Sequence, residues 1–159
     1  IDQYRRILAI DPKNNKAYQA IVSKYISLDD KNQAINYLKK QLRNVPNLKS
    51  VYFRLANLYI KEKDLASATE TLDEYLLKNS ASPEDLYLLS GLYYKIGHKD
   101  RSIGLIKRAI NGDPKNAKYH YALGAAYVKN NKMILARKQL RVLEDLDKNL
   151  AADLEKLME

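Results

Sequence analysis

The sequence predicts an all-α fold in which short pairs of helices stack side by side. Tyrosines recur at a constant interval, at Tyr25, Tyr59, Tyr93 and Tyr127. Each period contains two stretches in which apolar residues repeat at helical spacing, with a short polar break between them. No stretch of sequence shows the sustained alternation of a β-strand. Because so short a helix pair cannot bury its apolar faces alone, neighbouring pairs are expected to stack.

Further columns share the period of the tyrosines. Four residues before each tyrosine lies a large aliphatic residue, at Ile21, Leu55, Leu89 and Leu123. Nine residues after each tyrosine lies a small one, at Ala34, Ala68, Ser102 and Ala136. Pro12, Pro46 and Pro114 share another column and mark the ends of helices, because the residue before a proline disfavours helical geometry. The columns predict four full units, at residues 15–48, 49–82, 83–116 and 117–150.

The segments outside these units fit the same pattern. Residues 1–14 match the second helix of a preceding unit, with Tyr4 in a column that packs between helices. Residues 151–159 continue in phase and predict a capping helix with charged residues on its outer side. Its predicted inner stripe is Leu154, Leu157 and Met158, and Leu150 at the end of the fourth unit continues that stripe. The missing first helix before residue 1 suggests that the parent chain continues at its N-terminal side.

The helix–turn–helix unit and the length of its period resemble the tetratricopeptide repeat (TPR) family. The best matching stretches are Tyr119–Tyr127, with Ala136, and Arg108–Asn116. The resemblance implies a right-handed α-solenoid that forms a single array over residues 1–159. It also implies that the first helices of the units line a concave groove, while the second helices form the convex back.

The resemblance assigns a set of side chains to this groove. They are Phe53, Arg54, Asn57, Lys61, Tyr87, Leu88, Gly91, Tyr94, Lys95, Tyr121, Ala125 and Lys129. Phe53, Tyr87 and Tyr121 would form an aromatic row beside a row of cations, Lys61, Lys95 and Lys129. Aromatic side chains flanked by cations suit an extended or helical peptide that carries acidic residues. The same residues could equally be the ordinary lining of such grooves, and Gly91 could either open a pocket or be an accident of packing.

We therefore expect a protein-interaction scaffold that binds a peptide segment of a partner protein in the concave groove. The alternative is a module that associates with copies of itself through its open N-terminal edge and basic convex face. The carboxylate clamp by which some TPR proteins hold the C-termini of chaperones is not expected. Neither register of three units supplies its lysines, asparagines and arginine.

Composition argues against several other functions. The chain has no Cys and only His98 and His120, so we expect no metal, no cofactor and no enzymatic activity on a small-molecule substrate. His120 lies on an inner stripe and is interpreted as a packed core residue. Much of the positive charge falls on second helices, where Tyr37 alone could stack on a base, so nucleic acid is not the expected partner. No signal peptide or apolar run of roughly 18–20 residues is present, which favours a soluble, cytoplasmic protein.

Overall fold

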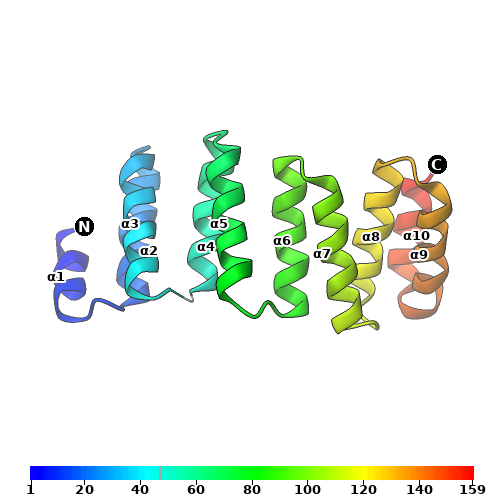
Figure 1. The fold of residues 1–159 in the computed structure, drawn as a ribbon, viewed down its shortest axis with the longest axis horizontal. Helices are drawn as coiled ribbons and strands as arrows, with labels where there is room; N and C mark the ends of the chain where they lie inside the picture. The colour runs from blue at the N-terminus through cyan, green and yellow to red at the C-terminus, as the bar shows by residue number, and fades with distance from the viewer. Residues whose placement is uncertain (47) are drawn as a thin grey trace. The chain divides into compact units, whose positions relative to one another are not determined.

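A computed structural model describes residues 1–46 and 48–159 of the chain. The described residues form ten α-helices and no strand, which confirms the predicted all-α class (Figure 1). The helices are α1 (Asp2–Ile10), α2 (Asn15–Ser27), α3 (Lys31–Asn44), α4 (Lys49–Lys61), α5 (Leu65–Lys78), α6 (Pro83–Ile96), α7 (Lys99–Gly112), α8 (Ala117–Lys129), α9 (Met133–Leu146) and α10 (Lys148–Leu157). The helices α2, α4, α6 and α8 begin at the first residue of each predicted unit. None of the helices in the described ranges is long and apolar enough to cross a membrane.

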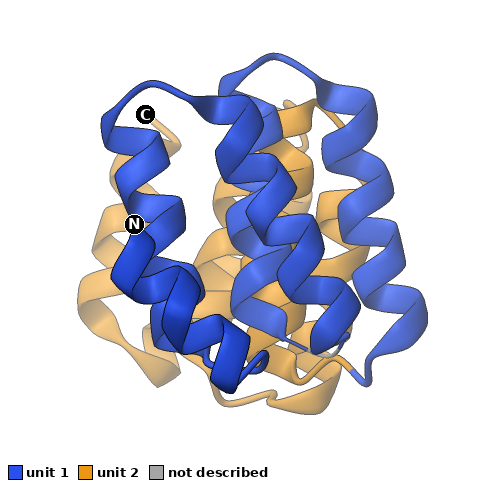
Figure 2. Cartoon of the chain, turned by 90° about the vertical axis from the view of Figure 1, so that its left-hand side faces the viewer, with its two compact units in different colours: residues 1–80 blue, residues 81–159 orange. Residues whose placement is uncertain are grey.

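The chain divides into two compact units, Ile1–Ser80 and Ala81–Glu159 (Figure 2). In unit 1, α2 packs against α3, α4 packs against α5, and α3 contacts α4. The short helix α1 lies against α2. In unit 2, α6 packs against α7, α8 packs against α9, and α7 contacts α8. The last helix, α10, contacts both α8 and α9, so each unit is a stack of helix pairs.

Local chemistry explains where several helices begin. The side-chain oxygen of Asn14 accepts a hydrogen bond from the backbone N–H of Ala17, and Asp30 and Asp64 cap α3 and α5 in the same way. Ser82 and Asp85 form a reciprocal capping box around the start of α6. Such caps satisfy backbone N–H groups that have no partner inside the helix.

The turn inside each helix pair contains one residue in the left-handed region of backbone space. These residues are Asp29, Lys63, Gly97 and Asn131, with φ of 56°, 60°, 99° and 56°. They occupy one column of the repeat, so the conformation of the turn recurs in every unit together with the helices. Glycine adopts this conformation without steric cost, and Asp and Asn tolerate it, whereas a lysine is strained there.

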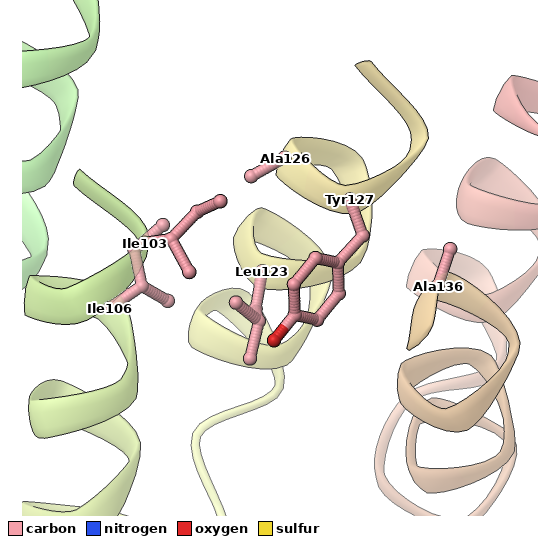
Figure 3. Packing of buried hydrophobic residues seen from close by; sticks show 6 residues of the cluster. All are labelled: Ile103, Ile106, Leu123, Ala126, Tyr127 and Ala136. Carbon is pink, nitrogen blue, oxygen red and sulfur yellow. The ribbon is translucent and has the colours of Figure 1, made fainter. Parts of the chain in front are cut away.

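The predicted columns form the cores of both units. The four periodic tyrosines are buried, as are the aliphatic residues four positions before them and the small residues nine positions after them. In unit 2, Ile103 and Ile106 of α7 meet Leu123 and Ala126 of α8, while Ala136 belongs to α9 (Figure 3). The small residues let neighbouring helices approach closely.

Two predictions near the ends of the chain were wrong. Tyr4 is 40% exposed, and none of the described residues of α1 is buried, because α2 covers only one side of this short helix. Leu157 is also exposed. The buried residues of α10 are instead Ala151 and Leu154. The helix α10 begins at Lys148 because the carboxylate of Asp147 caps its first turn.

The close approach of α10 depends on a glycine in α8. A Cβ atom at Gly124 would lie 2.5 Å from Cδ2 of Leu154. The side chain of Leu154 therefore occupies the space that any larger residue would need. This contact fixes the capping helix against the face of α8.

Candidate functional site

A pocket of about 290 Å³ opens between α6 and α8, and α7 also contributes to its lining. We call it the α6–α8 pocket. Its α6 wall consists of Tyr87, Leu88, Gly91 and Tyr94, and its α8 wall consists of Ala122, Ala125 and Lys129. Ile106 and Ala126 also line it, and both belong to the buried core between α7 and α8 (Figure 3). Part of the pocket lining therefore consists of core side chains whose positions are fixed by packing.

A buried tyrosine supports the aromatic wall. The ring of Tyr119 lies with its centroid 5.2 Å from that of Tyr87. The Tyr119 hydroxyl donates a hydrogen bond of 3.0 Å to Oε2 of Glu84. Burial, together with the neighbouring Glu84 carboxylate, raises the pKa of Tyr119 to about 12. The phenol therefore stays protonated at neutral pH, and the hydrogen bond keeps Tyr119 beneath Tyr87.

A cation lies against the ring of another wall residue. Nζ of Lys129 is 5.2 Å from the ring centroid of Tyr94, within the range of a cation–π interaction. Lys129 is exposed and keeps contact with water. Among the described residues that line the pocket there is no Asp or Glu. Lys129 is thus the one charged side chain in the described lining.

Gly91 contributes to the open volume. A Cβ atom built at Gly91 has no described atom other than its own helix and chain neighbours within 4 Å. A side chain at this position would point into unfilled space. The sequence raised two interpretations of Gly91, a pocket or a packing accident, and the structure places it in the pocket wall.

Unit 1 has a second pocket at the corresponding place, between α2 and α4, with a volume of about 330 Å³. We call it the α2–α4 pocket. Two repeat periods separate Arg54 from Ala122, Asn57 from Ala125 and Lys61 from Lys129, and the first residue of each pair lines the α2–α4 pocket. The two pockets therefore use the same backbone positions with different side chains.

Most residues that line the α2–α4 pocket are charged or polar, and one of its cations is already paired. Nζ of Lys31 lies 3.0 Å from Oε1 of Glu62 and 3.3 Å from Oδ1 of Asp29. The hydrogen bond to Glu62 raises the pKa of Lys31 most, and the hydrogen bond to Asp29 raises it further. The amide of Asn57 donates to the backbone carbonyl of Phe53 at 2.9 Å, so this side chain is turned back onto its own helix.

The structure distributes the predicted groove residues over several environments. Those in the α6–α8 pocket are Tyr87, Leu88, Gly91, Tyr94, Ala125 and Lys129. Those in the α2–α4 pocket are Arg54, Asn57 and Lys61. Lys95 is exposed in the last turn of α6 and lines neither pocket.

The proposed aromatic row is not uniform. Phe53 packs against Tyr75 of α5, with ring centroids 5.4 Å apart. Tyr121 packs against the buried cluster of α9 and α10 that contains Leu143 and Leu154. Of the three, Tyr87 is the one in the lining of the α6–α8 pocket. The sequence reasoning missed Ala122, although it occupies the same repeat column as Leu88, one period later.

Two other residues singled out by the sequence have structural roles. Tyr37, the candidate for base stacking, packs between Tyr18 and Tyr25, and its hydroxyl accepts a hydrogen bond from Nε of Arg5. His120 is buried, as predicted, and its ring nitrogens contact Oε1 of Gln139 and the carbonyl of Pro114. Within the described ranges, no cluster of His, Asp and Glu side chains could hold a metal ion.

Two family models match the chain. The model described as "Anaphase-promoting complex, cyclosome, subunit 3" matches residues 62–142, and the tetratricopeptide repeat model matches residues 16–47. A mouse relative, interferon-induced protein with tetratricopeptide repeats 2, is 26% identical over 141 residues, which is 86% of this chain. The chain covers only 30% of the length of that relative.

Solved structures share the fold. MamA from Desulfovibrio magneticus RS-1 superposes with a TM-score of 0.67 and 20% identity, over 92% of this chain and 82% of that one. YrrB, described as a TPR protein with an unusual peptide-binding site, gives a TM-score of 0.68 and 14% identity. That match covers 98% of this chain and 79% of YrrB. At these identities the likeness establishes the fold alone.

Proposed function

The chain belongs to the tetratricopeptide repeat family, and we propose that it binds a peptide segment of a partner protein in the groove formed by its first helices. The coarser assignment, a protein-interaction scaffold, follows from the family and the fold. Family members are typically non-enzymatic, so binding rather than catalysis is the activity to expect.

The observation that carries the proposal is the α6–α8 pocket. Groove positions on two successive first helices, including Tyr87, Gly91 and Ala125, come together around one open volume. Aromatic side chains in a desolvated pocket are typical of the residues that dominate binding energy at protein interfaces. The description of YrrB as a peptide-binding TPR protein agrees with a peptide as the ligand.

We further propose that the bound segment is acidic. Lys129 and Lys95 are both exposed on the first helices of unit 2. An acidic segment would be attracted to these cations, and the attraction would weaken as salt is added.

A pair of glycines in unit 2 provides a matched test. Gly91 and Gly104 are both helical, exposed, and without a described neighbour within 4 Å of a built Cβ, but only Gly91 is in the pocket lining. Gly91→Leu should fill the pocket with an internal side chain, whereas Gly104→Leu adds the same side chain to the outside of α7. Both variants should fold, because replacing a helical glycine relieves about 0.5–1 kcal/mol of backbone cost.

The experiment is affinity capture of cellular proteins by the wild type and the two variants, quantified by mass spectrometry. The proposal predicts proteins that the wild type and Gly104→Leu retain and that Gly91→Leu loses. Identical sets captured by both variants would contradict it. Circular dichroism verifies that helicity is equal in all three proteins.

Self-association is a second candidate, and the exposed apolar side chains of α1 favour it. Tyr4 and Ile7 are each 40% exposed, and Ile10 is 88% exposed. A second copy that covered this face would bury them. Light scattering should then show a mass that rises with concentration and that Ile7→Lys abolishes. A monomer at all concentrations would eliminate this candidate.

A further inference from the structure

Building on the proposed function, we infer that the α6–α8 pocket selects one large apolar side chain of the bound segment together with a neighbouring Asp or Glu. The ligand class is thus an apolar–acidic sequence motif. The pocket receives the apolar side chain, and Lys129 contacts the carboxylate.

The chemistry of the lining favours an apolar ligand group. The wall positions Leu88, Ala122 and Ala125 carry only aliphatic groups. Ser90 is buried, and its hydroxyl already donates to the carbonyl of Tyr87 at 2.6 Å. A polar ligand group would lose its hydration there and gain little in return, which favours an apolar side chain.

The size of the pocket fits a single side chain. The volume of about 290 Å³ lies at the lower end of the range for ligand pockets, which is roughly 300–1,000 Å³. It suits a single side chain of the Leu, Met or Phe type better than a cofactor. Burying such a side chain is favourable by about 1.5–3 kcal/mol.

The charge of Lys129 favours an acidic residue beside the apolar one. The ring of Tyr94 holds the ammonium group of Lys129 beside the apolar walls. Since no acidic residue is found in the described lining, the ammonium group has no carboxylate within the pocket. An Asp or Glu of the ligand, next to the apolar side chain in the pocket, would supply a carboxylate partner for this ammonium group.

Comparison with the α2–α4 pocket explains why we assign binding of the apolar–acidic motif to unit 2 and not to unit 1. Arg54 and Asn57 stand where the α6–α8 pocket has Ala122 and Ala125. Its Lys31 is already paired with Glu62 and Asp29 of the same unit. The α2–α4 pocket therefore has polar side chains at two positions where the α6–α8 pocket has alanine. Its lining also contains two carboxylates, Asp29 and Glu62, which would repel the acidic residue of the motif.

The test is selection from a displayed library of random peptides on the full chain, in parallel on the wild type, Lys129→Glu and Gly91→Leu, with Gly104→Leu as the control. The wild type and Gly104→Leu should enrich peptides with one large apolar residue and an adjacent Asp or Glu. Lys129→Glu should keep the apolar residue and exchange the acidic one for Lys or Arg. Acidic peptides from the wild-type selection should bind Lys129→Glu about threefold or more weakly.

Each other outcome overturns a defined part of the account. Enriched peptides that bind Gly91→Leu as tightly as the wild type would refute the apolar anchor and leave a groove-binding function elsewhere intact. An unchanged acidic preference in Lys129→Glu would refute the role of that lysine. If the wild type enriches no peptide, the proposed function falls together with this inference.

Discussion

The α2–α4 and α6–α8 pockets occupy the same positions of the repeat and differ in chemistry. Their volumes are similar, about 330 and 290 Å³. One has Arg54 and Asn57 where the other has Ala122 and Ala125. The repeat fixes where side chains project into the groove, because it fixes the backbone. The residues at those positions decide what each pocket can bind.

The charges of the two pockets also differ: the lining of the α2–α4 pocket contains carboxylates beside its cations, whereas the described lining of the α6–α8 pocket contains Lys129 and no carboxylate. In unit 1, the cation Lys31 is neutralised by carboxylates within the unit, although both Lys31 and Glu62 keep contact with water. Such exposed pairs contribute about 0–1 kcal/mol to stability, so their main effect is on the local potential. In unit 2, Lys129 is held by an aromatic ring, which leaves its charge in place.

The largest expected effect comes from giving one pocket the side chains of the other. Ala122→Arg with Ala125→Asn should lower the affinity of unit 2 for the selected peptide about tenfold to hundredfold, the equivalent of one apolar side chain left unburied. Fluorescence anisotropy of a labelled peptide measures it. The mirror variant, Arg54→Ala with Asn57→Ala, is the control in unit 1. An equal loss in both variants would show that the two pockets are not distinct in function.

A smaller effect should appear at alkaline pH. The hydroxyl of Tyr119 in unit 2 donates a hydrogen bond of 3.0 Å to Oε2 of Glu84. The hydroxyl of Tyr52 in unit 1 lies 3.5 Å from Oε1 of Glu74. The pKa of Tyr119 is about 12 in the folded chain and about 10 when unfolded, so the unfolded chain loses this proton first. The stabilisation is complete below pH 10 and is lost as the pH rises toward 12.

Urea unfolding of the wild type and Tyr119→Phe between pH 8 and about 12 tests this sign. The free energy of unfolding should fall more steeply with pH in the wild type than in the variant. Tyr52→Phe serves as the comparison in unit 1, where burial also raises the pKa of the phenol. Parallel curves for the wild type and Tyr119→Phe would contradict the account.

The smallest effect concerns the turns. Lys63 in unit 1 and Gly97 in unit 2 occupy the same left-handed position, with φ of 60° and 99°. Lys63→Gly should stabilise the protein by about 0.5–1 kcal/mol, and Gly97→Ala should destabilise it by about 1 kcal/mol. Chemical denaturation measures both. Changes of the same sign in the two variants would show that the turns are not equivalent.

The repeat frame could be predicted from the sequence because its signal is redundant. The columns of tyrosines, aliphatic residues and small residues recur in all four units, and the burial of these residues follows from helical periodicity. The prediction failed for Tyr4 and Leu157, which lie in helices near the ends of the chain. Burial there depends on whether a neighbouring helix is present, and a repeat column carries no such information.

The pocket could be predicted only in part. Gly91 stood out because the absence of a side chain between two tyrosines is visible in the sequence. The support of Tyr87 by Tyr119 and Glu84 was not foreseen, because these contacts join different helices through side-chain orientation. The aromatic row assumed equal directions at equal repeat positions, yet Tyr121 turns toward the cluster of α9 and α10.

Methyl NMR provides the most direct test of the central claim, that the α6–α8 pocket anchors an apolar side chain of a partner. The full chain is labelled with ¹³C at alanine methyl groups and titrated with a peptide selected on the wild type. The account predicts that the resonances of Ala122 and Ala125 shift most, while Ala20 in α2 stays unchanged. Saturable binding that leaves Ala122 and Ala125 unshifted would contradict it.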